Sequence, residues 1–256
     1  MFASSMFALF VLCLAAGALT GVAAADEAIP TTVTFEHDIQ PLLTRYGCNS
    51  GACHGKSRGQ NGFALSLLGF DSDFDFAAIT REARARRISP AAPDSSLILQ
   101  KATGRLPHGG GTRFDVDAHQ YRLLRKWIEN GSPRTPDDAP KLLRVVVEPA
   151  HLSMVSEQVV PIKVFAEYSD DSRRDVTASC SFQSNDHAIA AVSDEGVVKG
   201  GPVPGETAVL ARYMNHIAVC HVALPLPGDV PDEMYTALPV NNEIDRLVWK
   251  KLKVLG

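Results

Sequence analysis

Residues 48–54 read CNSGACH, two cysteines followed directly by a histidine. Covalent attachment of haem c needs two thiols, which add to the vinyl groups of the porphyrin, and an adjacent imidazole, which ligates the iron. The usual spacing is Cys-x-x-Cys-His, whereas four residues separate Cys48 from Cys53 here. The residues between them are small and leave room for the longer bridge to bulge beside the porphyrin. The stretch therefore predicts haem attached at Cys48 and Cys53, with His54 as an axial iron ligand.

Two other uses of these side chains remain open. Outside the cytoplasm a local disulfide can join Cys48 and Cys53, with His54 an ordinary polar residue. A zinc site would need a fourth ligand, and residues 31–133 hold no second cysteine pair. The histidine directly after Cys53 favours haem, because a plain disulfide does not require it.

The residue types present in residues 31–133 limit which side chain could be the second axial ligand of the iron. All five methionines fall outside residues 31–133, which excludes a methionine ligand from this part of the chain. Besides His54, the range contains His37, His108 and His119. His108 stands in the loop LPHGGGTRF, whose glycines would let the backbone approach the macrocycle closely. We predict His108 as the distal ligand, which would give a lower reduction potential than histidine–methionine ligation. The alternatives are a loop histidine without a ligand role and a five-coordinate iron.

Helix-forming patterns surround this motif. Apolar residues recur at helical spacing in residues 35–46 and 117–130, and Gly131 stands where a helix C-cap would lie. Residues 74–87 predict a third helix, ended by the prolines that follow. Four arginines in and near its second half are interpreted as a solvated helix face: Arg81, Arg84, Arg86 and Arg87.

The composition changes after a proline-rich linker at residues 134–141. Residues 142–226 alternate strand-like runs with turn signals, which predicts an immunoglobulin-like β-sandwich. Cys180 and Cys220 lie in separate predicted strands, and either a bridge or two buried free thiols would fit. Residues 241–256 begin an amphipathic helix.

The beginning of the chain has the pattern of an export signal. Residues 6–19 are almost wholly apolar, and three alanines precede Asp26 where a signal peptidase would cut. The run is shorter than the roughly 20 residues that a membrane helix needs. We therefore expect a signal peptide at residues 1–25 and a periplasmic, secreted or cell-envelope protein without a membrane span. The net charge of −4 does not suggest a nucleic-acid partner.

Three stretches resemble known families. The first part of the chain resembles the planctomycete-type cytochrome c domain. The resemblance lies in the segments FEHDIQPLLTRYGCNSGACHGKSRGQNGFALSLLGFD, PDSSLILQKATGRLPHGGG and YRLLRKWIENG. A bacterial immunoglobulin-like domain of group 2 resembles DVTASCSFQSNDHAIAAVSDEGVVKGGPVPGETAVLARY. The opening of a planctomycete domain of unknown function resembles NNEIDRLVWKKLKVLG, and the order of the three also matches.

The resemblance implies haem attachment at Cys48 and Cys53, with axial ligation by His54. Commoner family members have a two-residue cysteine spacing, and a Met-Pro segment where this chain has Leu106-Pro107-His108. If the third domain is normally longer, this chain is a truncated product.

The expected fold class is therefore multidomain. An all-α cytochrome c-like domain at residues 31–133 is followed by an all-β immunoglobulin-like sandwich at residues 142–226 and by the start of a truncated helical domain at residues 241–256.

The expected function is electron transfer by covalently bound haem c. The redox partner would be another protein or a fused C-terminal domain, and the sandwich would be a spacer, a docking element or a contact to the cell envelope or to glycans. The alternative is a non-redox adhesion or carbohydrate-binding protein with a Cys48–Cys53 disulfide. A haem enzyme with an open iron position is a third hypothesis, although no nucleophile–base set or carboxylate pair stands out.

Overall fold

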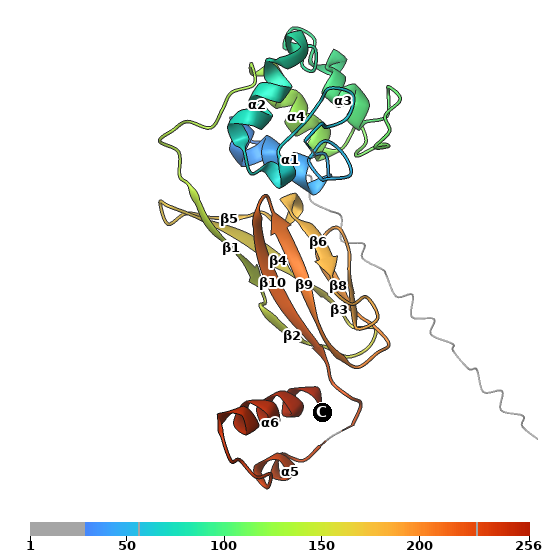
Figure 1. The fold of residues 1–256 in the computed structure, drawn as a ribbon, viewed down its shortest axis with the longest axis vertical. Helices are drawn as coiled ribbons and strands as arrows, with labels where there is room; N and C mark the ends of the chain where they lie inside the picture. The colour runs from blue at the N-terminus through green and yellow to red at the C-terminus, as the bar shows by residue number, and fades with distance from the viewer. Residues whose placement is uncertain (1–28, 56, 229) are drawn as a thin grey trace, which may run out of the picture.

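A computed structural model describes residues 29–55, 57–228 and 230–256 of the chain. The expected export signal at residues 1–25 lies outside the described residues. Three parts follow one another along the long axis of the molecule: a helical unit, a strand-rich unit and a pair of C-terminal helices (Figure 1).

Short helices and long loops make up the helical unit. Its α-helices are α1 (Gln40–Arg45), α2 (Ser72–Thr80), α3 (Leu97–Ala102) and α4 (His119–Glu129). A π-helical turn, η1 (Phe35–Ile39), leads directly into α1. Three 3₁₀ turns lie in the connections: η2 (Leu67–Gly69), η3 (Glu82–Ala85) and η4 (Pro93–Ser95).

A buried aromatic cluster forms the centre of the helical unit. Trp127 of α4 is fully buried, with its ring centroid 5.7 Å from that of Phe35. Phe76 of α2 meets the Phe35 ring edge-on at 5.3 Å. The predicted helical stripe of α4 is confirmed, and Gly131 follows the helix with φ +82°. The stripe buries four side chains: Tyr121, Leu124, Trp127 and Ile128.

The predicted helix at residues 74–87 is shorter than expected. Asp71 caps α2, and its side chain accepts a hydrogen bond from the backbone N–H of Phe74 at 3.0 Å. After Thr80 the chain enters η3, where three consecutive residues have left-handed backbone angles: Ala83, Arg84 and Ala85. L-residues adopt this region only at a cost of about 1–2 kcal/mol each, so a right-handed helix ends here.

The strand-rich unit contains three sheets. Their strand orders are β1-β4-β5, β2-β10-β9-β6 and β3-β8-β7. The strands are β1 (Leu142–Glu148), β2 (His151–Ser153), β3 (Val159–Pro161), β4 (Lys163–Tyr168), β5 (Arg173–Asp175), β6 (Ser181–Ser184), β7 (Ala190–Val192), β8 (Val197–Gly200), β9 (Gly205–Tyr213) and β10 (His216–Leu224). A 3₁₀ turn, η5 (Thr177–Ser179), precedes β6.

The β9–β10 hairpin provides the longest pairing of this unit. It runs antiparallel from the pair Tyr213–His216 to the pair Gly205–Leu224. Alternate β10 side chains point inward and are buried: Ala218, Cys220, Val222 and Leu224. This alternation of buried and outward-facing residues is the period of two that the sequence pattern predicts for a strand.

Two helices end the chain beyond the strands. They are α5 (Asp232–Thr236) and α6 (Glu243–Leu255). The Asn242 side chain caps α6 by accepting a hydrogen bond from the backbone N–H of Asp245 at 3.0 Å, which confirms the predicted helix. Within the described part of the chain, no helix has the length and apolar character that crossing a membrane requires.

The expected fold class is wrong. Instead of an all-α cytochrome c-like domain followed by an all-β sandwich, the described residues form a mixed chain of six α-helices and three sheets. A helical turn, η5, lies among the strands, and α5 and α6 follow them. Much of the part before the strands is loop: glycines with positive φ follow α1, α3 and α4, and the left-handed residues of η3 follow α2.

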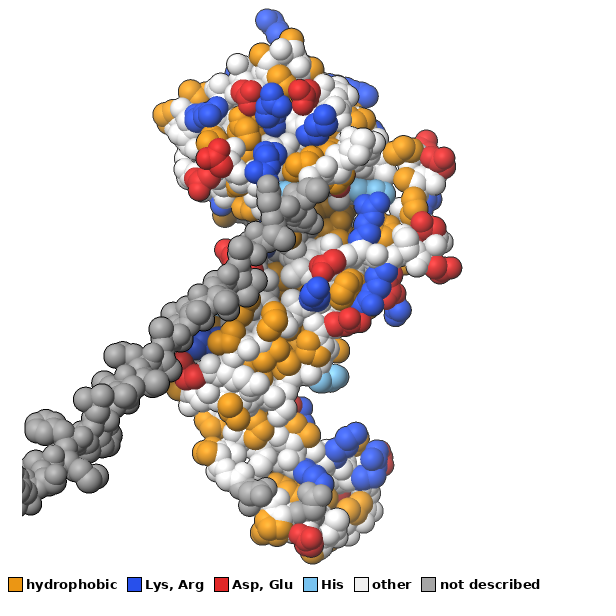
Figure 2. Space-filling model, turned by 180° about the vertical axis from the view of Figure 1, so that it is seen from behind, with side chains coloured by type: hydrophobic (Ala, Val, Ile, Leu, Met, Phe, Trp, Pro, Cys, Tyr) orange, Lys and Arg blue, Asp and Glu red, His pale blue; other side chains and the backbone are white. Residues whose placement is uncertain are grey.

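Side chains of both charges share the surface of the helical unit. Seen from behind, its Lys and Arg side chains lie among Asp and Glu, and hydrophobic side chains gather over the strand-rich unit (Figure 2). Interspersed positive and negative side chains are typical of a protein surface that faces solvent.

Candidate functional site

The CNSGACH segment folds into a tight loop after α1. The backbone N–H of Cys48 donates to the carbonyl of Leu43 at 2.8 Å, and the N–H of His54 donates to the carbonyl of Cys48 at 3.0 Å. A side chain at Gly55 would meet the carbonyl oxygen of Asn49 at 1.9 Å, so only glycine fits at that position. The loop thereby brings both cysteines and His54 to the same cavity.

This cavity has a volume of about 550 Å³, within the range of small-molecule and cofactor sites. Its sequence-predicted lining residues are Cys48, Cys53, His54 and His108. Apolar side chains from α1, α3 and the loops line it as well: Leu43, Phe63, Leu97, Ile98 and Ala102. The four residues that the sequence singled out therefore share one largely apolar cavity, although His108 is far from the motif in the chain.

His54 and His108 face each other within the cavity. Their ring centroids are 6.2 Å apart, and the ring planes differ by 10°. The Nδ1 atom of His54 lies 2.8 Å from the carbonyl oxygen of Phe63, and the Nδ1 atom of His108 lies 3.2 Å from that of Gly111. Each carbonyl can accept a hydrogen bond from an Nδ1–H group, which leaves both Nε2 atoms for another partner.

On balance, the surroundings of His54 disfavour its charged form. Burial lowers the pKa of His54, and the charges of His108, Arg87 and Arg113 lower it further, against the bond to the Phe63 carbonyl, which raises it. A neutral imidazole is the form that ligates a metal ion.

Both cysteines of the motif are free thiols. Burial raises the pKa of Cys48 to about 11, so this thiol is protonated at neutral pH. The Nη2 group of Arg113 lies 3.2 Å from the sulfur of Cys53. Within the described chain, Arg113 Nε is buried without a hydrogen-bond partner, and a buried donor of this kind calls for an acceptor that the protein itself does not supply.

Basic side chains at this cavity were missed or misread from the sequence. Arg87 is not part of a solvated helix face: it is only 5% exposed. Its guanidinium donates to the carbonyls of Ala78 at 2.5 Å and Gly62 at 2.7 Å and lies 4.4 Å from the centroid of the Phe63 ring. Arg113 gave no sequence signal, because its role depends on a contact with Cys53 across 60 positions of the chain.

The donor set fits a haem group better than a bare metal ion. Among the described residues, no group of three or more His, Cys, Asp or Glu side chains is arranged to hold a metal ion. A haem iron needs at most two ligands from the protein, because the porphyrin supplies four nitrogen ligands. His54 and His108, whose ring centroids are 6.2 Å apart, would be the residues that hold the iron of a haem in this cavity.

The other cysteines and histidines of the described residues lie outside this cavity. Cys180 and Cys220 are buried free thiols in the strand-rich unit, and burial raises the pKa of Cys180 to about 12 and that of Cys220 to about 11. His37 and His119 line a different cavity, at the junction of the helical and strand-rich units.

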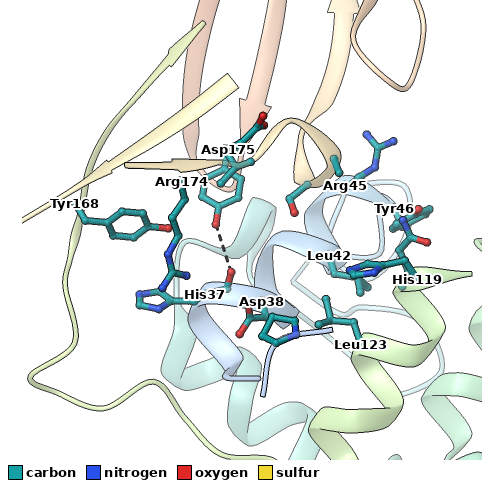
Figure 3. A pocket seen from close by; sticks show the side chains of 16 residues that line it. His37, Asp38, Leu42, Arg45, Tyr46, His119, Leu123, Tyr168, Arg174 and Asp175 are labelled. Atoms are coloured by element: carbon teal, nitrogen blue, oxygen red, sulfur yellow. Dashed lines mark hydrogen bonds between the residues drawn. The ribbon is translucent and has the colours of Figure 1, made fainter. Parts of the chain in front are cut away.

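Hydrogen bonds join the helical and strand-rich units at this junction. Arg45 of α1 donates from Nη2 to the carbonyl of Asp194 at 2.7 Å and from Nη1 to the carbonyl of Cys180. The Tyr213 hydroxyl donates to the carbonyl of His37 at 3.4 Å, the bond drawn in Figure 3. The cavity enclosed here has a volume of about 180 Å³.

His37 is half-buried at the junction. Its ring packs edge-on against Tyr168, with centroids 5.6 Å apart. Burial and the charge of Arg174 lower the pKa of His37, against smaller effects of Asp38, the Pro140 backbone and Glu36 that raise it. The Arg174 side chain lies beside the imidazole in Figure 3.

The free energy of unfolding should therefore depend on the protonation of His37. An unfolded histidine takes up a proton near pH 6.5, whereas the folded one does so only at lower pH. Stability is thus lost as the pH falls below about 6.5. Burial raises the pKa of Asp38, whose contribution has the opposite sign, but this acts in the more acidic range of carboxyl groups. Urea unfolding of the full chain at pH 7.5 and 5.5 measures the loss, which should be smaller in His37→Gln. An equal loss in both proteins would contradict this assignment.

Comparisons with known proteins add little. No family model and no curated protein matches the chain. Domains 5-6 of the S-layer protein SbsC are 19% identical over 36% of this chain and 48% of theirs, with a TM-score of 0.31. Domains 4 and 5 of SbsC are 16% identical over 34% of this chain and 53% of theirs, with a TM-score of 0.28. The chain spans about half the length of these two structures, and such distant likeness carries no argument about fold or function.

Proposed function

We propose that this chain binds haem covalently and transfers electrons. The observation that carries the proposal is the pair His54 and His108, which face each other at 6.2 Å across a cavity that Cys48 and Cys53 also line. Cys48 and Cys53 would hold the haem through thioether bonds to its vinyl groups, and His54 and His108 would hold the iron. When bound, haem supplies an iron that accepts and releases one electron.

The protein's own groups prepare the site for this task. The carbonyls of Phe63 and Gly111 lie within hydrogen-bonding distance of the Nδ1 atoms of the two histidines. Bonds of this kind set the orientation and tautomer of a ligating imidazole. The apolar lining would exclude water, which favours the less charged, reduced state of an iron and limits side reactions. Arg113, with an unpartnered buried Nε, and Lys101 offer positive charge to the carboxylates of a haem.

The proposed setting is the periplasm, the cell envelope or the exterior. It rests on the export pattern of residues 6–19 and on the location of c-type haem attachment outside the cytoplasm. The redox partner would be another protein or a C-terminal domain fused to this chain. The strand-rich unit would act as a spacer or docking element, or as a contact to the envelope or to glycans.

Haem loading in a host with cytochrome c maturation factors tests the proposal. The purified chain should be coloured, and haem should stay with the polypeptide on a denaturing gel. The variant Cys48→Ser/Cys53→Ser should lose the covalent haem, whereas Cys180→Ser should keep it, because that thiol lies in the other unit. A colourless wild-type chain under conditions that mature a control cytochrome would reject the proposal and favour the non-redox alternative.

A further inference from the structure

Two histidines lie side by side on the strand-rich unit, apart from the cavity just described. His151 is in β2 and His221 in β10, and these strands run parallel with the two residues directly opposite each other. Their ring centroids are 5.1 Å apart, and the ring planes differ by 16°. Directly paired residues project from the same face of a sheet, so the register itself holds the two imidazoles next to each other.

Both side chains are accessible from solvent. His151 and His221 are exposed, and β2 is the edge strand of its sheet. Among the residues that the structure describes, neither ring has a hydrogen-bond partner, and the two rings pack against each other. The inward neighbour Val222 is buried in the core, which anchors this part of β10.

We propose that His151 and His221 form a binding site for a divalent transition-metal ion. Imidazole nitrogens bind such ions at about 2 Å, so two ligands of one ion need nitrogens about 3 Å apart. Parallel rings with centroids 5.1 Å apart can reach that separation by side-chain rotation alone, without movement of the strands. Copper(II) is the preferred ion, because affinity for nitrogen ligands rises along the first-row series to copper and falls again at zinc.

The site differs in kind from the haem cavity. Two protein ligands leave the other coordination positions to water or to a group from outside, so the ion would exchange with solvent and would not be needed for folding. It also lies away from the helical unit: Figure 1 places β2 toward the end of the sheet nearest the C-terminal helices. Metal binding here is therefore independent of haem loading.

Titration of the full chain with copper(II), carried out both with and without haem maturation, tests the proposal. The wild type should bind one equivalent whose electron paramagnetic resonance signal shows nitrogen ligation. Loss of an outer-shell partner already weakens metal binding about 10–100-fold, so His151→Ala and His221→Ala should each weaken it at least tenfold. His187→Ala is the matched control, because His187 is exposed in the same unit but has no histidine opposite it on a strand. Unchanged copper affinity in both single variants, or an equal loss in the control, would overturn the proposal.

Discussion

Replacing His108 by alanine in the haem-loaded chain should convert a low-spin spectrum into a high-spin one. His108 faces His54 across the cavity at 6.2 Å with nearly parallel rings. If both imidazoles hold the iron, alanine would remove one of its two protein ligands, and the ligand field would weaken. Covalent haem should remain, because the two cysteines and His54 are unchanged. Absorption spectra of the oxidised and reduced protein measure the change.

Replacing His108 by methionine separates ligation from a general effect on folding. A thioether ligand should restore the low-spin spectrum and raise the reduction potential, since methionine ligation favours the reduced iron. Axial ligands tune haem potentials over a span of about 0.8 V, so the shift should be resolved by redox titration. His119→Ala serves as the matched control, because His119 belongs to the same unit but lines the junction cavity. A spectrum that stays low-spin in His108→Ala would remove His108 as the ligand.

Local sequence patterns predicted the parts of the fold that depend on neighbouring residues. The helical stripe that ends at Ile128 was recognisable because α4 is long enough for its period to repeat. Most long strands were recognisable for the same reason. β2 and β5 have only three residues each, which is too few to show a period, and all three β5 residues, Arg173–Asp175, are exposed. The predicted helix at residues 74–87 stopped early because η3 turns left-handed, which no periodic pattern announces.

The candidate site was only partly predictable. Cys48, Cys53 and His54 are adjacent in the chain, so their spacing alone suggested the chemistry. His108 was reached by eliminating methionine, and its place opposite His54 follows from long-range packing. Arg113 escaped detection altogether, because an arginine shows no pattern that reveals a contact with a sulfur atom 60 positions away. Sequence patterns report local periodicity and chemistry, whereas contacts between distant loops arise only when the core has formed.

Replacing Trp127 by alanine should have the largest effect on stability. Trp127 is fully buried and packs against Phe35 and Phe76. Its Nε1 group donates to the carbonyl of Pro133 at 2.9 Å, so it also ties the end of the helical unit to α4. Alanine removes the ring and leaves a cavity, which costs about 3–5 kcal/mol for a buried tryptophan. Because whole domains are stable by only about 5–15 kcal/mol, this unit should unfold at a much lower denaturant concentration.

A conservative variant and a matched control separate packing from the hydrogen bond. Trp127→Phe keeps most of the ring and should cost less, because the Pro133 carbonyl still accepts the backbone N–H of Phe35 at 3.1 Å. Trp249 is the control: its Nε1 also donates to a proline carbonyl, that of Pro239 at 3.0 Å, but it lies in α6, beyond both units. Chemical unfolding followed by circular dichroism should show a large shift for Trp127→Ala and almost none in the helical transition for Trp249→Ala. Equal shifts would mean that the aromatic cluster around Phe35 does not hold the helical unit together.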